Sequence, residues 1–506
     1  MKQAIYFTAL LLFPWACVPD NGNYTYVDPG TLLPPTVTGI DAEYTLHMMD
    51  TLRVTPLVAE GAGEENDYLW YVYSTTMQRD TIGHSRELVF PVTLLPALNY
   101  RVTFQITNRE SGLYRYYYTT LKVTTPFAEG WYVTKDQNNV TDLDFIFPDG
   151  KLAANILSAA NGEGVPGEAV TSANAKNITV IVPLDDGRDS TFKDHDCIYV
   201  ATRSTVQLYD LESMALMNKI ENLFMLLPDK VAPADVICTA EAKVITNDSV
   251  SYCLDTRASA ANIGKWGIVT PGSRIDPVNM CRSVVGGFLV FDPDTRSLKQ
   301  LNSWKKAYSA VQAIGGTVPT TNMNFDMVFM KEKATMMAGG VALMKKRGTD
   351  ELQGFTISGL LAGGLWENPT SPIIMNPFAT SVTVPAGSRL HDATLYGTHG
   401  SMDVLYFSRG DNELWYYHLV NGIEENVLTL PAGESVVYAQ TVVRYISGAT
   451  YTNLAVLTSG GGRWTLRVYD FQPSSPLVAA EPLLVSSGEG NPRNVFYRSL
   501  TSTTSF

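Results

Sequence analysis

The chain contains 506 residues, more than one hydrophobic core usually holds, so at least two domains are expected. Its formal net charge of -13 argues against nucleic-acid binding, which needs clustered Lys and Arg to neutralise phosphate, and it disfavours docking on anionic lipid. The simplest role of this charge is solubility. Five cysteines are too few for a disulfide-dense scaffold.

The first residues have the pattern of a secretory signal. A short apolar stretch runs from Ala4 to Phe13, and residues 1–16 form the predicted signal peptide. The stretch is too short to span a bilayer, and no later segment approaches the roughly 20 apolar residues of a transmembrane helix. Ala16 before Cys17 resembles the lipobox of bacterial lipoproteins, although Pro14 stands where Leu is usual. We therefore predict lipidation of Cys17; the alternative is an ordinary secretory signal with a chance cysteine.

The next segment is a predicted tether. Residues 17–34 contain Asp, Asn, Gly, Pro and Thr but little that could enter a core. One acyl chain binds a membrane only marginally, whereas the multiple chains of a bacterial lipoprotein give durable anchoring.

Residues 35–126 show alternating strand patterns separated by polar turns. The segments 50–56, 68–73 and 100–107 are the clearest strands, and in the last of them the apolar side chains fall on alternate positions. A domain of this size suits a seven-stranded Ig/PKD-like β-sandwich with Trp70 as its buried tryptophan.

Residues 127–506 contain a repeat. In the five clearest copies an apolar strand ends in Thr or Ser, a short polar turn follows, and a second strand ends in an aromatic residue or Leu followed by Asp or His; the copies at 287–292 and 342–357 are looser. Seven copies, spaced by roughly 40 to 65 residues, predict a β-propeller of seven blades. The alternative is an antiparallel protein of another kind with hairpins at intervals. The copies lie at residues 131–145, 198–210, 244–255, 287–292, 342–357, 404–418 and 457–470. One short helix is expected from Asp210 to Asn222.

Metal-ligating residues are sparse. Asp194, His195 and Asp196 form the most suggestive cluster, but neighbours in an extended chain point in opposite directions and could not readily chelate one metal. The segment 292–297 resembles part of a calcium loop but lacks its Gly and its closing Glu, so a hairpin turn explains it better. The sequence therefore predicts no metal and no cofactor.

Catalytic residues are equally sparse. His391 and His399 could meet across a turn, but no HExxH, GxSxG or Walker motif accompanies them. His418 occupies a position where other repeats have Asp, which favours a structural hydrogen bond. No catalytic residue is predicted.

The cysteines after Cys17 lack CxxC spacing and lie in apolar strand-like runs, so buried free thiols are favoured over a bridge between Cys238 and Cys253. The four are Cys197, Cys238, Cys253 and Cys281.

Aromatic side chains are the remaining candidates for ligand contact. Tyrosines crowd one strand of the sandwich, where alternate members must face opposite sides, and three tryptophans lie in loop-like contexts. Exposed aromatic rings offer flat amphipathic surfaces to sugars, peptides or a protein partner, whereas burial in the core is the plainer alternative. The predicted ligand-contacting residues are Trp266, Trp304, Trp366, Tyr116 and Tyr118.

Several segments together resemble a known family. Cys17 followed by residues 20–26, the strand 50–56, the segment 68–70 and the strand 100–104 with Gly112 after it are similar to the PKD-like lipoproteins of Bacteroidota. Residues 130–133 and 142–144 look like the usual start of the larger C-terminal region of these proteins. The resemblance covers roughly the first 145 residues.

The resemblance implies a setting. Such proteins are typically encoded beside a TonB-dependent SusC-like transporter and a SusD-like lipoprotein, and they act in nutrient import at the outer membrane. The acidic motif that directs lipoproteins to the cell surface is represented by Asp20 alone.

We therefore expect a cell-surface accessory lipoprotein of a SusC/SusD-type importer that binds an oligopeptide or glycan, docks on the transporter, or does both. The alternatives are a propeller hydrolase or lyase that uses loop carboxylates with His391 or His399, and a purely structural partner subunit.

Overall fold

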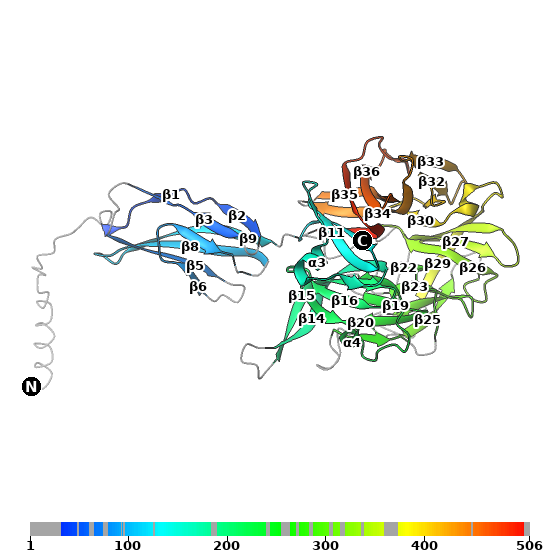
Figure 1. Cartoon of the computed structure of the whole chain (residues 1–506), viewed down its shortest axis with the longest axis horizontal. Coiled ribbons are helices and arrows are strands. Elements are labelled where there is room, and N and C mark those ends of the chain that lie inside the picture. The colour runs from blue at the N-terminus through cyan, green and yellow to red at the C-terminus, as the bar shows by residue number, and fades with distance from the viewer. Residues whose placement is uncertain are drawn as a thin grey trace, which may run out of the picture. The chain divides into compact units, whose positions relative to one another are not determined.

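In the computed structural model, the chain divides into two compact units, Met1–Thr124 and Thr125–Phe506. The sequence predicts this boundary after residue 126. The structure describes residues 32–499 apart from 48–49, 60–64, 74–78, 93, 95–96, 125–126, 184–189, 239–242, 255–263, 270–272, 283–286, 303–306, 314–318, 335–338, 359–372 and 447–448. Nearly all of the regular secondary structure in the described part is β-strand (Figure 1).

The N-terminal unit has two layers. A five-stranded sheet has the order β2-β9-β8-β5-β6, and the two-stranded pairs β1-β4 and β3-β7 supply the second layer. The strands are β1 (Val37–Thr38), β2 (Glu43–His47), β3 (Thr51–Val54), β4 (Leu57–Val58), β5 (Asn66–Tyr73), β6 (Arg79–Gly83), β7 (Leu88–Pro91), β8 (Ala97–Asn108) and β9 (Tyr114–Thr124).

One core joins these layers. Leu52 and Leu88 from the small pairs pack with Trp70 and Phe104 from the large sheet. Trp70 is fully buried, as predicted, and its indole nitrogen donates to the carbonyl oxygen of Ser85 at 3.0 Å. Because side chains alternate along a strand, the other face of the five-stranded sheet is left outside this core.

The C-terminal unit contains seven antiparallel groups of four strands in the described residues, most of them labelled in Figure 1. The first group combines β38 (Asn491–Arg498) with β10 (Gly130–Gln137), β11 (Val140–Ile146) and β12 (Leu152–Ala153). The short β13 (Val165–Pro166) also pairs with β11.

The other six groups follow in chain order. They are β14 (Ala169–Pro183), β15 (Ser190–Thr202), β16 (Val206–Asp210) and β17 (Leu216–Lys219); β18 (Pro233–Cys238), β19 (Lys243–Asn247), β20 (Val250–Leu254) and β21 (Trp266–Ile268); β22 (Met280–Arg282), β23 (Gly287–Asp292), β24 (Ser297–Asn302) and β25 (Ala307–Ala313); β26 (Phe325–Glu332), β27 (Gly340–Lys346), β28 (Leu352–Ser358) and β29 (Ile373–Thr383); β30 (Leu395–Thr398), β31 (Val404–Ser408), β32 (Glu413–His418) and β33 (Glu424–Thr429); and β34 (Ser435–Ile446), β35 (Ala449–Gly460), β36 (Arg463–Asp470) and β37 (Leu484–Glu489). A parallel pairing of β25 with β29 joins two groups into one eight-stranded sheet.

Each predicted repeat falls in a hairpin of two neighbouring strands in one of these groups, and the looser copy at 287–292 covers only the first strand of its hairpin. The hairpins are β10-β11, β15-β16, β19-β20, β23-β24, β27-β28, β31-β32 and β35-β36. All five residues are buried in β16, in β19 and in β31. A strand buried along its whole length has both faces covered by neighbouring elements.

The Asp or His that closes the repeat fixes the following turn. A carboxylate oxygen of Asp292 accepts from the backbone nitrogens of Asp294 and Thr295, both at 2.9 Å. The backbone nitrogen of Val420 donates to Nδ1 of His418 at 3.3 Å. These contacts confirm a hairpin turn at 292–297 and a structural role for His418.

Hydrophobic clusters lie between consecutive groups. Each group packs against the next one in the chain, and the first packs against both the second and the seventh. In the last of these contacts Trp131 and Val495 meet Leu457 and Trp464. The core of this unit is therefore divided among the spaces between groups.

Helices are short. The predicted helix over residues 210–222 is wrong in most of its length, because Leu216–Lys219 pairs as β17 and only α4 (Ile220–Leu223) is helical. Sequence reasoning missed α3 (Ile156–Asn161) and the 3-10 helix η1 (Arg389–Asp392). No helix in the described part of the chain has the length and apolar character needed to cross a membrane.

Candidate functional site

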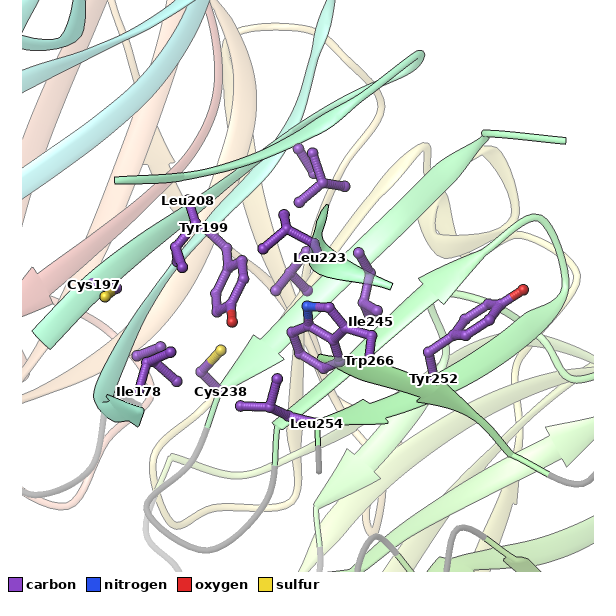
Figure 2. Close-up of a cluster of buried hydrophobic side chains, with 14 of the residues drawn as sticks. Ile178, Cys197, Tyr199, Leu208, Leu223, Cys238, Ile245, Tyr252, Leu254 and Trp266 are labelled. Carbon is purple, nitrogen blue, oxygen red and sulfur yellow. The ribbon is translucent and has the colours of Figure 1, made fainter. Parts of the chain in front are cut away.

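Trp266 is part of the core. It lies in β21 and is fully buried, and its ring meets that of Tyr199 with 5.2 Å between centroids. Figure 2 shows the indole enclosed among Leu223, Ile245 and other apolar side chains of the cluster. The prediction that Trp266 contacts a ligand is therefore wrong. The residues around it have a loop-like composition, although Trp266 itself belongs to a short strand at the edge of its sheet.

Three other predicted site residues, Cys17, Trp304 and Trp366, lie outside the described residues. Their predicted roles stay predictions.

Exposed tyrosines line one face of the five-stranded sheet. Tyr114, Tyr116 and Tyr118 occupy alternate positions of β9 and are 51%, 40% and 52% exposed. Their ring centroids are 4.9 Å and 6.3 Å apart along the strand. Tyr117, between them, turns the other way and packs against the core. We call this row, together with the largely buried Tyr71 of β5 on the same sheet face, the tyrosine face.

Arginine side chains cover part of the tyrosine face. The guanidinium of Arg101 lies 3.9 Å from the ring centre of Tyr118, and that of Arg79 lies 3.9 Å from the ring centre of Tyr71. Such stacking holds a ring in place and contributes roughly 0.5–1 kcal/mol at an exposed site. The face is thus ordered before any ligand arrives, which lowers the entropy lost on binding.

The hydroxyl of Tyr116 stays protonated at neutral pH. Desolvation, together with a hydrogen bond to Tyr114, raises the pKa of Tyr116 to about 12. Its phenol can therefore donate and accept hydrogen bonds, while its ring offers an apolar surface. This combination suits the hydroxyls and C–H faces of sugars, or the amide groups and side chains of peptides.

The histidines highlighted in the sequence serve the local structure. Nδ1 of His195 lies 2.9 Å from a carboxylate oxygen of Asp210, whereas Asp196 accepts from Arg498 at 2.9 Å. Asp194 accepts from the hydroxyl of Thr179 instead, so the three neighbours point to different partners. No group of three His, Cys, Asp or Glu side chains within the described ranges is arranged to hold a metal.

His399 is buried, and its Nδ1 accepts from the backbone nitrogens of Ser401 and Met402 at 3.1 Å and 3.0 Å. Burial, with a smaller contribution from the charge of Lys333, lowers the pKa of His399 to about 4. His391 instead places Nε2 3.1 Å from the carbonyl oxygen of Pro385.

The four later cysteines are buried thiols outside any disulfide, as predicted. Burial raises the pKa of Cys238 to about 12, which keeps that thiol protonated and unreactive.

The start of the C-terminal unit carries a motif whose residues are explained by geometry. Gly130 has φ of +153°, and a Cβ there would lie 2.4 Å from the carbonyl oxygen of Ile146. Asp142 accepts from the backbone nitrogens of Leu157 and Ser158 at 3.0 Å and 3.1 Å, so it holds the first turn of α3.

Asp144 is fully buried and has three partners, of which the first is the backbone nitrogen of Asn155, donating at 2.8 Å. It accepts from Nζ of Lys135 at 2.9 Å and from the indole nitrogen of Trp464 at 2.9 Å. In the segments 130–133 and 142–144, Gly130, Asp142 and Asp144 therefore each stabilise the fold.

The family comparison bears on these motifs. Residues 17–169 match the PKD-like family. The resemblance to PKD-like proteins is thus confirmed, and the match extends past the N-terminal unit to the start of β14. None of the curated proteins matches the chain. The PKD-like region therefore includes the whole tyrosine face and the motif residues Gly130, Asp142 and Asp144.

Sequence reasoning missed one further feature, a cavity of about 200 Å³ in the C-terminal unit with both polar and apolar walls. Its walls come from β14, β18, β22, β26, β34 and β38, with Val278 and Ala334 just outside two of them. Because the six strands are spread over more than 300 residues, no local pattern could have indicated it.

Proposed function

We propose that this chain is a cell-surface binding protein, lipid-anchored in the outer membrane of a bacterium, that serves a SusC/SusD-type nutrient importer. Its tyrosine face contacts an oligopeptide or glycan. The observation that carries the proposal is the row of Tyr114, Tyr116 and Tyr118, each exposed by 40% or more, with the guanidinium of Arg101 stacked on Tyr118.

Contiguous exposed aromatic rings are uncommon on a surface that has no partner. Tyrosine supplies contact area at little conformational cost, because only two side-chain torsions have to be fixed. A shallow hollow of about 280 Å³, bordered by Arg101 and Tyr118, gives this face a concave end. These features favour binding by contact alone, without a chemical step.

The membrane setting rests on the N-terminal sequence. The PKD-like match begins at Cys17, the residue that the lipobox pattern marks as the first of the mature protein. Residues 17–34 would then connect the anchor to the N-terminal unit. The importer setting rests on the resemblance to the Bacteroidota lipoproteins.

We further propose that residues 127–506 form a seven-bladed β-propeller. Three features support this arrangement: seven four-stranded groups, hydrophobic clusters between neighbouring groups, and the pairing of the C-terminal β38 with β10. In a propeller the last strand commonly completes the first blade, which removes an open edge.

Ligand binding is tested with the full chain on arrays of glycans and oligopeptides. The double variant Tyr116→Ala/Tyr118→Ala is expected to lose about tenfold or more in affinity, since each aromatic contact contributes roughly 0.5–1.5 kcal/mol. Tyr451→Ala is the matched control, because Tyr451 is 46% exposed and also lies near an arginine, at 5.8 Å. Equal affinity in all three proteins would contradict the proposed site.

The setting is tested by recovering the tagged chain from native outer membranes. Co-purification of a SusC-like transporter and a SusD-like lipoprotein is expected, and recovery of the chain alone would contradict it.

Cys17→Ser is expected to abolish incorporation of labelled fatty acid and release the protein from the membrane.

A further inference from the structure

Acidic side chains beside the tyrosine face are already neutralised. Glu43 and Asp67 lie on the same side of the five-stranded sheet as the tyrosine row, and they pair with Lys122 and Arg109, both at 2.8 Å. Asp80 of β6 is in register with a core residue of β5, so its side chain belongs to the opposite side of the sheet. These carboxylates are therefore not available to other cations on the tyrosine face.

Two arginines of this face have no counter-charge. Arg79 and Arg101 flank Tyr73 in one cross-strand row, so they are two strands apart, which is roughly 10 Å. Within the described residues neither forms an ion pair, and each guanidinium instead stacks on a tyrosine ring at 3.9 Å. Stacking uses the flat side of a guanidinium and leaves its N–H edge for a carboxylate, which it can bind in bidentate geometry. The face therefore complements an anionic ligand, although the net charge of the chain is -13.

Neighbouring groups take up part of the flat surface of each tyrosine ring on β9. Tyr114 and Tyr116 are tilted by 48° with 4.9 Å between their centroids, and Tyr116 and Tyr118 by 35° with 6.3 Å. Arg101 covers one side of the Tyr118 ring. A sugar ring that stacks on tyrosine needs such a flat surface to be open, so these contacts disfavour a glycan.

The spacing of the tyrosines matches an extended peptide. Tyr114, Tyr116 and Tyr118 recur at every second residue of β9, which is about 7 Å along the strand. An extended peptide lying along β9 has the same repeat on each of its sides, so one of its side chains can meet each tyrosine in turn. The shallow hollow bordered by Arg101 has room for an acidic side chain at the Tyr118 end of the row. Tyrosine and arginine are also the residue types enriched where proteins recognise polypeptides.

We propose that the ligand of the tyrosine face is an acidic oligopeptide, which lies extended along β9 and pairs its carboxylates with Arg101 and Arg79. The inference rests on the proposed function, because it selects one of the two ligand classes at the same site. The tyrosines supply contact area, and the two arginines distinguish acidic peptides from neutral ones. Added salt weakens the binding, because both arginines are exposed and their charges are screened.

The experiment is titration calorimetry of the full chain with heptapeptides that have blocked termini. Glu alternates with Thr in the first peptide, and Gln alternates with Thr in the second. Trigalacturonate presents carboxylates on a glycan instead. The Glu peptide is expected to bind saturably, about tenfold more tightly than either of the other two probes, and to lose affinity as sodium chloride is added.

The double variant Arg79→Gln/Arg101→Gln removes both charges and keeps polar side chains. It is expected to abolish the tenfold preference for the Glu peptide over the Gln peptide. Arg53→Gln/Arg86→Gln is the matched control, because it changes the net charge equally at two exposed arginines, one on β3 and the other in the turn between β6 and β7. The control should keep the preference.

Four outcomes would overturn the inference: no binding of the Glu peptide, equal binding of the Glu and Gln peptides, tighter binding of trigalacturonate, or a preference that Arg79→Gln/Arg101→Gln retains. The first three need no variant. If the Gln peptide or a neutral glycan binds as tightly as the Glu peptide, and Tyr116→Ala/Tyr118→Ala loses that binding, the proposed function stands and only the preference for acidic peptides fails.

Discussion

In the N-terminal unit, Tyr114, Tyr116 and Tyr118 stand exposed on the outer face of a sheet, whereas in the C-terminal unit Trp266 and Trp464 are fully buried. The difference follows from how the sheets are covered. The five-stranded sheet contacts its core on one face only, while the groups of the C-terminal unit pack against neighbours on both faces.

The same contrast holds for charged pairs. Asp67 and Arg109 of the N-terminal unit meet at 2.8 Å with more than half of each side chain exposed, whereas Lys135 and Asp144 meet at 2.9 Å with 3% and 0% exposed. Two ion pairs of nearly the same length therefore contribute different energies, because desolvation and solvent screening differ between them. Whether a side chain serves binding or stability depends on the face it occupies, and the following predictions test that distinction.

The largest effect is expected from Asp144→Ala. Removing one partner leaves Lys135 charged and buried, which should cost about 3–5 kcal/mol of unfolding free energy. Trp464 also loses its acceptor. Urea unfolding, followed through the transition of the C-terminal unit, measures this loss. Asp67→Ala, at the exposed pair, is the control and should cost less than about 1 kcal/mol. Similar losses of unfolding free energy in the two variants would show that burial does not make the Lys135–Asp144 pair contribute more than the exposed pair.

Aromatic residues should divide in the same way. Trp266→Ala opens a cavity in the core drawn in Figure 2 and is expected to cost about 3–5 kcal/mol. Tyr116→Ala removes an exposed ring and should change stability by no more than about 0.5 kcal/mol. Thermal denaturation of both variants tests this, and an unstable Tyr116→Ala protein would argue that the tyrosine face is structural.

These two residues also show what the sequence could predict. Alternation along β9 predicted that Tyr116 and Tyr118 share a face opposite that of Tyr117, and the structure shows that theirs is the exposed face. Trp266 was misassigned because β21 has only three residues, too few for a pattern, and its burial depends on Tyr199 and Ile245 from distant strands.

The hairpins were predictable for a local reason. Each consists of two strands that are consecutive in the chain and joined by one turn. Asp292 fixes the turn inside its hairpin, whereas His418 fixes the turn that follows its hairpin. The cavity was not predictable, since Asn494 and Thr171 come together from opposite ends of the C-terminal unit. The short helix α3 depends on Asp142, more than ten residues earlier in the chain.

Acid should weaken the C-terminal unit through His399. Its pKa of about 4 lies below the usual value of 6.5, so between these pH values the unfolded chain binds the proton more readily. Stability is therefore full above pH 6.5 and falls as the pH drops towards 4, by about 3 kcal/mol in total. Protonation also removes the acceptor for Ser401 and Met402.

Unfolding free energies of the wild type and His399→Asn at several pH values measure this contribution, because the asparagine oxygen can accept the same bonds without titrating. The variant is expected to lose less stability than the wild type between pH 6.5 and 4. Parallel curves would assign the acid sensitivity to other groups.

The smallest effect is expected where Arg101 stacks on Tyr118. Both side chains are exposed, so their coupling should amount to only about 0.5–1 kcal/mol. A double-mutant cycle with Arg101→Met, Tyr118→Ala and the combined variant isolates this energy from the effect of each residue alone. Arg101→Lys keeps the charge but loses the planar guanidinium, so it should retain only part of the coupling. A coupling above about 2 kcal/mol would mean that the arginine and the ring are held as rigidly as a buried pair, and the contrast between the two units would then not extend to their surfaces.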